Sequence, residues 1–259
     1  MREVFVPYVE AQKYDYMITK NKIKLIKSLA RKKNRQQSHL FVVEGYKSIR
    51  ELKNAGLGIQ EIYVTQDAKE LDDLEVIHIS NKEMQTISNQ TTAPGYLAVV
   101  ETVTTSELPV EGLVIALDGI QDPGNLGTII RLADWFNVKH LICNHGTVDL
   151  YNPKCVQATM GSIARVQVHY MDLKEFFSRT KLPVLVTEME APSLYDAQLP
   201  KNGILLLGNE SNGVSAELLK SGSRISIPSY GEEQEATESL NVATATAIIL
   251  AEWRRSIGK

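Results

Sequence analysis

The segment that most constrains the fold is a short apolar run followed by a polar loop and then by an amphipathic pattern. Leu113–Leu117 is continuously apolar, which is typical of a strand buried on both faces of a parallel sheet. Asp118–Asn125 contains the turn signal Pro123-Gly124, so we predict a loop there. From near Leu126 the apolar residues recur at helical spacing, which predicts a helix. In an open α/β sheet such a loop lies at the carboxyl end of its strand, where ligands bind.

Two polar side chains of this segment are candidates for one site. Asn125 closes the predicted loop, and Arg131 follows six positions later, or about one and a half helical turns. We therefore expect Asn125 and Arg131 to address the same ligand. On this segment alone, a surface loop with a solvated arginine explains the pattern equally well.

Strand and helix patterns alternate along the chain and divide it into two α/β units. We expect the first unit at residues 17–102, a linker at 103–112 and the second unit at 113–259. A length of 259 residues suffices for two ordinary domains. Residues 1–16 lack periodicity, and we expect them to be either an extension or an upstream start that precedes the true start at Met17.

The net charge of −3 hides a strongly basic segment. Residues 20–50 hold ten basic residues and a single acidic one, Glu44. Such an imbalance favours a polyanionic partner, RNA or DNA, over a helix face that is merely solvated. Lys32, Lys33 and Arg35 are our candidate RNA-binding residues.

Other sequence features exclude several function classes. No apolar run approaches the roughly 20 residues of a membrane-spanning helix, and the amino terminus lacks a signal-peptide core. We therefore expect a cytoplasmic protein without membrane contact. Cys143 and Cys155 make no disulfide framework, and no Cys/His cluster has zinc spacing, so no metal is expected. The P-loop motif is absent, and no G-x-G-x-x-G follows a predicted strand.

Two further loops follow predicted strands. Gly208-Asn209-Glu210 comes after the strand Gly203–Leu207, and Ser239-Leu240-Asn241 comes after the strand Arg224–Ile227 and before the last helix. Taken singly, turn geometry explains the glycine, and helix capping explains the polar residues before the last helix.

Together these segments resemble the three motifs of SpoU-type (TrmH-like) RNA methyltransferases of the SPOUT superfamily. The matching residues are Asn125-x-Gly127-x-x-x-Arg131, Gly208-Asn209-Glu210, and Ile227-Pro228 with Glu238-Ser239-Leu240-Asn241-Val242. Asn152-Pro153-Lys154 and Ala158-Thr159-Met160-Gly161-Ser162 resemble a fourth family segment. Each motif alone is weak, whereas four motifs in order are specific.

The first unit resembles the substrate-binding domain that precedes the catalytic unit in one branch of this family. The matching segments are Phe41–Gly45 and Thr92–Val99. That domain is similar to ribosomal RNA-binding proteins.

The resemblance implies an α/β fold with a parallel-sheet catalytic domain, a C-terminal trefoil knot and a smaller N-terminal RNA-binding domain. It implies a homodimer that transfers a methyl group from S-adenosylmethionine to a ribose 2′-hydroxyl in ribosomal or transfer RNA. The alternative is a non-catalytic RNA-binding or ribosome-assembly protein that retains the fold. The basic first unit disfavours a methyltransferase that acts on protein.

The resemblance also implies residue roles. The catalytic residues are Arg131, Asn125, Glu210, Ser239 and Asn241, and the donor site consists of Leu207, Gly208, Asn209, Glu210, Ile227, Pro228 and Leu240. Because a guanidinium stays protonated, we expect Arg131 to polarise the hydroxyl or hold a phosphate while another group takes the proton. We expect Glu210 to fix Arg131 by a charge-assisted hydrogen bond. Asn125 and Asn241 are expected to orient RNA or Arg131.

Two positions depart from the family pattern. Gly231–Glu238 is longer than the usual spacer and acidic, and Ser211 stands where glycine is common. Neither change removes a motif residue, so an active enzyme is expected. The motifs do not specify the target nucleotide, because RNA recognition depends on loop shape and dispersed contacts.

Overall fold

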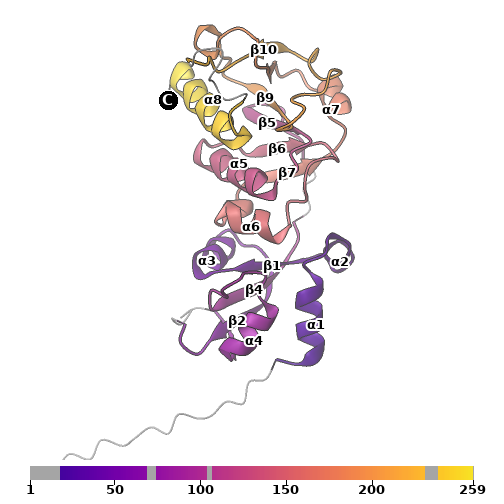
Figure 1. Cartoon of the computed structure of the whole chain (residues 1–259), viewed down its shortest axis with the longest axis vertical. Coiled ribbons are helices and arrows are strands. Elements are labelled where there is room, and N and C mark those ends of the chain that lie inside the picture. Colours follow the sequence, from indigo (N-terminus) through magenta and orange to yellow (C-terminus); the bar gives the residue numbers. More distant parts are fainter. Residues whose placement is uncertain (1–17, 69–73, 104–106, 231–238, 259) are drawn as a thin grey trace, which may run out of the picture.

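The structure of the chain is a computed structural model that describes residues 18–68, 74–103, 107–230 and 239–258. The expected extension at residues 1–16 and the acidic segment at 231–238 lie outside the described residues. One sheet precedes the linker and one follows it, so we call residues 18–103 the N-terminal unit and residues 107–258 the C-terminal unit. Figure 1 shows the two units stacked along the long axis of the molecule.

The N-terminal unit is a four-stranded mixed sheet with helices on both faces. Its elements are α1 (Lys20–Ser28), α2 (Lys32–Ser38), β1 (Leu40–Glu44), α3 (Tyr46–Asn54), β2 (Ile59–Thr65), β3 (Ile77–Ile79), α4 (Asn81–Ile87) and β4 (Tyr96–Glu101). The strand order is β1-β4-β2-β3, in which β4 is antiparallel to β1 and β2, and β3 is parallel to β2. This arrangement confirms the small α/β sheet that the sequence predicts.

Alternate residues of β1 face two different hydrophobic cores. Phe41 and Val43 pack in the core that contains the apolar residues of α3. Leu40 and Val42 pack in a second core, with residues of α1 and α4. Successive side chains of a strand point to opposite faces, so both faces of this sheet are buried.

The C-terminal unit is a six-stranded parallel sheet. Its elements are β5 (Leu113–Asp118), α5 (Pro123–Trp135), β6 (His140–Cys143), α6 (Pro153–Thr159), the short 3-10 helix η1 (Ser162–Ala164), β7 (Gln167–Tyr170), α7 (Leu173–Arg179), β8 (Val184–Thr187), the 3-10 helix η2 (Leu194–Asp196), β9 (Gly203–Gly208), β10 (Ser223–Ile225) and α8 (Val242–Ile257). The strand order is β10-β8-β9-β5-β6-β7, and every pairing is parallel. The expected parallel sheet is therefore confirmed.

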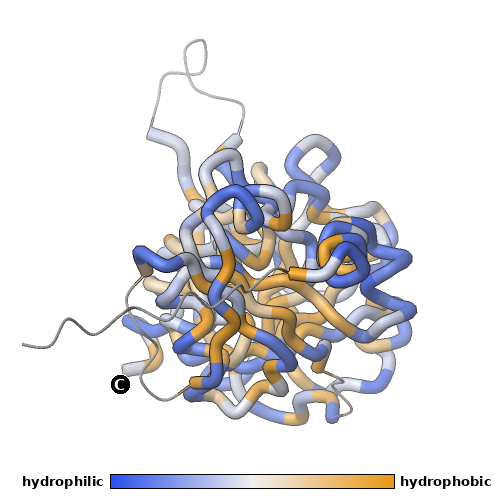
Figure 2. Tube along the Cα trace, turned by 90° about the horizontal axis from the view of Figure 1, so that it is seen from below, coloured by the Kyte–Doolittle hydropathy of each residue, from blue (hydrophilic) through white to orange (hydrophobic). Residues whose placement is uncertain are grey.

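Strand β5 lies in the middle of this sheet and is buried on both faces. Ile115 and Leu117 face the core formed with α5 and α8. Val114 and Ala116 face the core formed with α7. In Figure 2 the hydrophobic segments gather inside the molecule, and the hydrophilic segments lie outside. The apolar run that opens the second unit thus forms the strand on which both layers of helices pack.

Helix α5 begins at Pro123, three residues before the position that its apolar spacing predicts. Asp122 is the N-cap, and its side chain accepts a hydrogen bond from the Asn125 backbone N–H. Proline is favoured at the first helical position, because its missing N–H needs no partner there. The Pro123-Gly124 pair is therefore a helix start rather than a loop turn, and Asn125 lies in the first helical turn.

Helix α6 lies at the junction of the two units, next to β1 and near α3 (Figure 1). On the other side α6 packs along α5. The predicted trefoil knot is not tested by these pairings and stays a prediction. Within the described ranges, none of the helices has the length and apolar character needed to cross a membrane.

Candidate active site

A chain of two side-chain hydrogen bonds joins the three loops that carry the sequence motifs. The Asn125 amide donates to Glu210 Oε1 over 2.7 Å. The Asn241 amide donates to Asn125 Oδ1 over 2.9 Å. These residues are far apart in the sequence, yet they come from α5, from the loop after β9 and from the start of α8. The structure thus brings three of the five predicted catalytic residues together at one edge of the parallel sheet.

Local capping fixes the side chain of Asn241 and the backbone of Asn125. Asn241 is the N-cap of α8, and its Oδ1 accepts hydrogen bonds from the N–H groups of Ala243 and Thr244. With Oδ1 engaged in this cap, the Asn241 amide nitrogen remains to donate to Asn125. Asn125 itself is held by the Asp122 cap of α5. Helices α5 and α8 pack against each other, so their two N-termini have a defined separation.

The loop after β9 closes tightly on itself. The backbone groups of Asn209 and Gly213 exchange two hydrogen bonds of 3.0 and 2.9 Å. A Cβ atom on Gly208 would lie 2.1 Å from the carbonyl carbon of Gly213, so only glycine fits. The Asn209 side chain reaches the carbonyl of Gly119 over 2.7 Å. Ser211 is accommodated, because its N–H donates to Asn209 Oδ1.

Asp118 is a structural residue that the sequence analysis did not identify. Its carboxylate is 8% exposed and accepts hydrogen bonds from the Asn144 amide and from the Ser215 N–H. Asp118 therefore ties the end of β5 to the loops that follow β6 and β9. The sequence signal for this role was a carboxylate directly after a fully apolar strand. Such a carboxylate is buried with the strand end and therefore requires hydrogen-bond partners.

Arg131 does not join the hydrogen-bonded cluster. Its side chain is exposed on α5, and in the described parts of the chain no ion pair or hydrogen bond of its guanidinium occurs. Six helical residues turn the chain by about 600°, so Arg131 points roughly 120° away from Asn125. The expectation that Glu210 fixes Arg131 is not met, because Glu210 binds Asn125 instead.

The other predicted site residues surround the same edge of the sheet. Leu207 is buried near the end of β9, whereas Ile227 and Pro228 follow β10 and are half-buried. Ser239 and Leu240 are exposed just before α8, with Leu240 47% exposed. These residues offer backbone groups on a tight glycine loop together with an exposed apolar side chain. Such a combination fits an adenosine moiety, which needs hydrogen bonds to its edge and apolar contact to its face.

The structure separates the three candidate RNA-binding residues. Lys32 and Lys33 are exposed on α2, as expected. Arg35 is 4% exposed, which contradicts its expected place on an RNA-binding surface. Its guanidinium donates to the Asp149 carboxylate and to the carbonyls of Leu29 and Ala30. The inward face of the short helix α2 therefore places Arg35 in the contact between the units.

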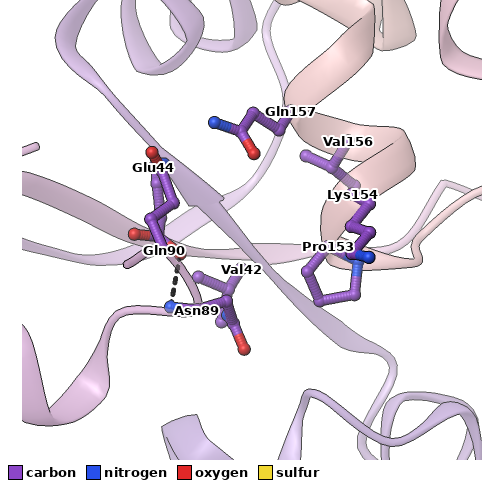
Figure 3. A pocket seen from close by; sticks show the side chains of 8 residues that line it. All are labelled: Val42, Glu44, Asn89, Gln90, Pro153, Lys154, Val156 and Gln157. Atoms are coloured by element: carbon purple, nitrogen blue, oxygen red, sulfur yellow. Dashed lines mark hydrogen bonds between the residues drawn. The ribbon is translucent and has the colours of Figure 1, made fainter. Parts of the chain in front are cut away.

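A small cavity lies at the junction between the units (Figure 3). Its volume is about 30 Å³, and its lining comes from β1, the segment after α4 and α6: Val42, Glu44, Asn89, Gln90, Pro153, Lys154, Val156 and Gln157. A small-ligand pocket measures roughly 300 Å³ or more, so this cavity has room for water only. Among the residues that the structure describes, no cluster of three or more His, Cys, Asp or Glu side chains could hold a metal ion.

Comparisons with known proteins place these features in a family context. The SpoU rRNA methylase family matches residues 112–251, and the MRM3-like substrate binding domain matches residues 20–98. The chain is 31% identical to the 23S rRNA (guanosine(2553)-2′-O)-methyltransferase RlmP of Bacillus subtilis over 243 residues, which cover 90% of this chain and 96% of that protein.

Solved structures show the same likeness across both units. A protein of the TrmH family of RNA methyltransferases from Porphyromonas gingivalis is 38% identical, with a TM-score of 0.81 over 92% of this chain and 99% of that one. An rRNA methyltransferase from Sinorhizobium meliloti with bound AdoMet is 27% identical, with a TM-score of 0.81 over 92% and 95%.

Proposed function

The chain belongs to the SpoU rRNA methylase family, and we propose that it methylates a ribose 2′-hydroxyl of 23S rRNA. It is an RNA 2′-O-methyltransferase that uses S-adenosylmethionine as the methyl donor. Its similarity to RlmP spans nearly all of both proteins, including the N-terminal unit, and this extent supports 23S rRNA as the substrate. The hydrogen-bonded chain Glu210–Asn125–Asn241 is the structural observation that carries the site assignment.

We assign the donor site to the backbone and side chains around Gly208, Ile227-Pro228 and Leu240. When bound, S-adenosylmethionine supplies a methyl group made electrophilic by its sulfonium centre. The tight turn at Gly208 keeps backbone groups at the surface, and the exposed Leu240 offers apolar contact. Leu207, Asn209 and Glu210 complete the proposed site.

We assign the catalytic role to Arg131. A ribose hydroxyl is a weak nucleophile near neutral pH and must lose its proton as its oxygen takes up the methyl group. In this proposal the exposed guanidinium of Arg131, which has no protein partner among the described residues, polarises that hydroxyl or holds the adjacent phosphate. Because arginine remains protonated, the proton leaves to water or to another group.

Asn125, Glu210 and Asn241 act as positioning residues in this proposal. Their mutual hydrogen bonds hold the three loops in one arrangement, and pre-organisation of this kind is a main contribution to a displacement reaction. Ser239, exposed two residues before the Asn241 cap, is assigned to the RNA side of the same site.

We further infer a homodimer in the cytoplasm, where ribosomal RNA is modified. Trp135 is 83% exposed on α5, one turn beyond Arg131, and tryptophan is enriched in protein interfaces. A Trp135→Glu variant is expected to sediment as a monomer at concentrations where the unmodified protein is a dimer. Met189→Glu, at a residue that is 69% exposed, is the control. A monomeric unmodified protein at micromolar concentration would contradict the inference.

The function is tested by transfer of labelled methyl groups from S-adenosylmethionine to 23S rRNA that lacks endogenous methylation. Transfer RNA and 16S rRNA serve as alternative acceptors, and nucleoside mapping identifies the labelled position. Arg131→Ala is compared with Arg179→Ala, which removes an exposed arginine of α7 that pairs with Glu175.

Label on one ribose 2′-oxygen of 23S rRNA, lost in Arg131→Ala and kept in Arg179→Ala, supports the proposal. Label on transfer RNA alone would move the substrate assignment. Donor binding without transfer to any RNA would favour the non-catalytic, ribosome-assembly alternative.

A further inference from the structure

One hydrophobic core extends through both units. It contains Phe41 and Val43 of β1 together with Leu126 and Ile129 of α5. The Phe41 ring contacts the Tyr151 ring, with centroids 4.5 Å apart. The Tyr151 hydroxyl also accepts a hydrogen bond from the linker at the Val103 N–H over 2.8 Å. The N-terminal unit is therefore packed against the C-terminal unit rather than only tethered to it.

A buried ion pair, between Arg35 and Asp149, also joins the two units. Arg35 of α2 donates through Nε and Nη2 to Asp149 Oδ2, while Nη1 donates to the carbonyls of Leu29 and Ala30. Asp149 precedes α6 by four residues. Because Arg35 is 4% exposed and its donors are engaged, its position fixes the end of α1 relative to the start of α6.

A second ionic contact links the N-terminal unit to α5 itself. Arg165 donates to both carboxylate oxygens of Asp134, in the last turn of α5, and also pairs with Glu51 of α3. Burial acts to raise the pKa of Asp134, but hydrogen bonds from Arg165 and Ser162 outweigh it and lower the pKa below its ordinary value. The three side chains thus form a charged bridge from α3 to the helix that carries Arg131.

Two glycines permit this close packing. A Cβ on Gly161, whose φ is +94°, would lie 2.6 Å from Cβ of Glu51. A Cβ on Gly127 of α5 would lie 2.5 Å from Cβ of Ala158 in α6. At Gly161 the turn after α6 is therefore in direct contact with α3. At Gly127 the first turns of α5 are in direct contact with α6.

We propose that Arg35, Asp149, Glu51 and Arg165 are positioning residues that set the distance between the RNA bound to the N-terminal unit and the reacting ribose at α5. In this arrangement the target nucleotide is selected by a fixed spacing between the two contacts on the RNA. The proposal rests on the proposed function, because it assigns the specificity of that same methyl transfer.

The test uses the full chain with the double variant Glu51→Gln/Asp149→Asn, which removes one carboxylate charge from each ionic contact and preserves side-chain shape. The control is Glu175→Gln/Asp196→Asn, in which both carboxylates are exposed and distant from the junction. Glu51→Gln alone serves as a milder variant, because its ion pair is partly exposed and exposed ion pairs contribute little to stability. Measurements are kcat and KM for 23S rRNA, donor affinity, and the distribution of label over nucleotides.

We expect the double variant to lose about tenfold in kcat, with KM for RNA and donor affinity within twofold of the unmodified protein. We also expect label at nucleotides that the unmodified protein leaves free. A merely structural defect would lower total label without redistributing it. Unchanged kcat and unchanged label distribution in both variants would overturn the proposal. Failure of the unmodified protein to methylate any RNA would instead overturn the proposed function, and the positioning proposal with it.

Discussion

Arg35 is buried at the junction and donates to Asp149 and two carbonyls, whereas Arg131 is exposed on α5, the helix that also carries Asn125. The carboxylate partner of Arg35, Asp149, lies in the other unit. At the three-loop site Asn125, Glu210 and Asn241 bind one another, and the Arg131 guanidinium has no partner among the described residues.

This difference separates a buried, paired arginine that holds two units together from an exposed, unpaired arginine to which we assign the catalytic role. A paired and buried charge contributes to one arrangement of the two units, and its loss leaves an uncompensated partner. An exposed and unpaired charge contributes little to stability; in the proposed function Arg131 acts on RNA instead. Both kinds of residue look alike in the amino-acid sequence.

The strongest test of this comparison substitutes each arginine by alanine. Arg35→Ala should lower the free energy of unfolding by about 3 kcal/mol, because it leaves Asp149 without its cation. Arg131→Ala should change that free energy by less than about 0.5 kcal/mol but lower kcat roughly 100-fold. Chemical denaturation and single-turnover methylation measure the two effects. Equal stability losses in both variants would remove the distinction.

The junction can also be broken through its backbone. Gly161→Ala should lower the free energy of unfolding by about 2 to 4 kcal/mol, since it combines a left-handed φ with a clash against Glu51. Gly146→Ala is the control, because a Cβ there meets its nearest atom at 3.4 Å. Thermal and urea unfolding provide the measurement. A Gly161→Ala protein as stable as the control would show that the junction adjusts easily.

A smaller effect is expected at the exposed basic residues Lys32 and Lys33 of α2. Lys32→Ala/Lys33→Ala should weaken RNA binding about three- to tenfold and reduce the salt dependence by roughly one unit per lost phosphate contact. Donor affinity and stability should not change. The matched control is Lys181→Ala/Lys220→Ala, on the exposed surface of the C-terminal unit. Fluorescence anisotropy over a salt series checks the result, and equal affinities for the two double variants would exclude this part of α2 from RNA contact.

The smallest effect concerns a histidine pair that lies neither at the junction of the units nor at the three-loop site. His140 Nδ1 and His169 Nε2 lie 3.3 Å apart on β6 and β7, and burial lowers the pKa of both rings below the ordinary 6.5. The unfolded chain therefore binds more protons, so stability should be complete above pH 6.5 and fall as the pH drops below it. His169→Gln should lose less stability than the unmodified protein between pH 7.5 and pH 5.5, with the exposed His145→Gln as control. Identical pH profiles for His169→Gln and the unmodified protein would contradict the expectation.

The sequence alone supports the central strand, the loop–helix pattern and the meeting of the three motif loops. These follow from the apolar run at Leu113–Leu117 and from the resemblance of the motifs, because strand order brings the carboxyl ends of parallel strands to one edge. The start of α5 was misassigned because proline serves both turns and first helical positions. The burial of Arg35 could not be predicted, because its partner Asp149 lies 114 residues away and periodicity describes only near neighbours.

The continuous core through Phe41 and Tyr151 also determines which part of the chain can be exchanged in a chimera. A chimera cut at the linker would set a foreign RNA-recognising half against a surface shaped for Arg35, Glu51 and Phe41. The transferable block is therefore larger than residues 18–103 and includes residues 144–165, which carry the complementary surface. In this architecture, replacing the N-terminal unit alone therefore also alters the contacts that support α5.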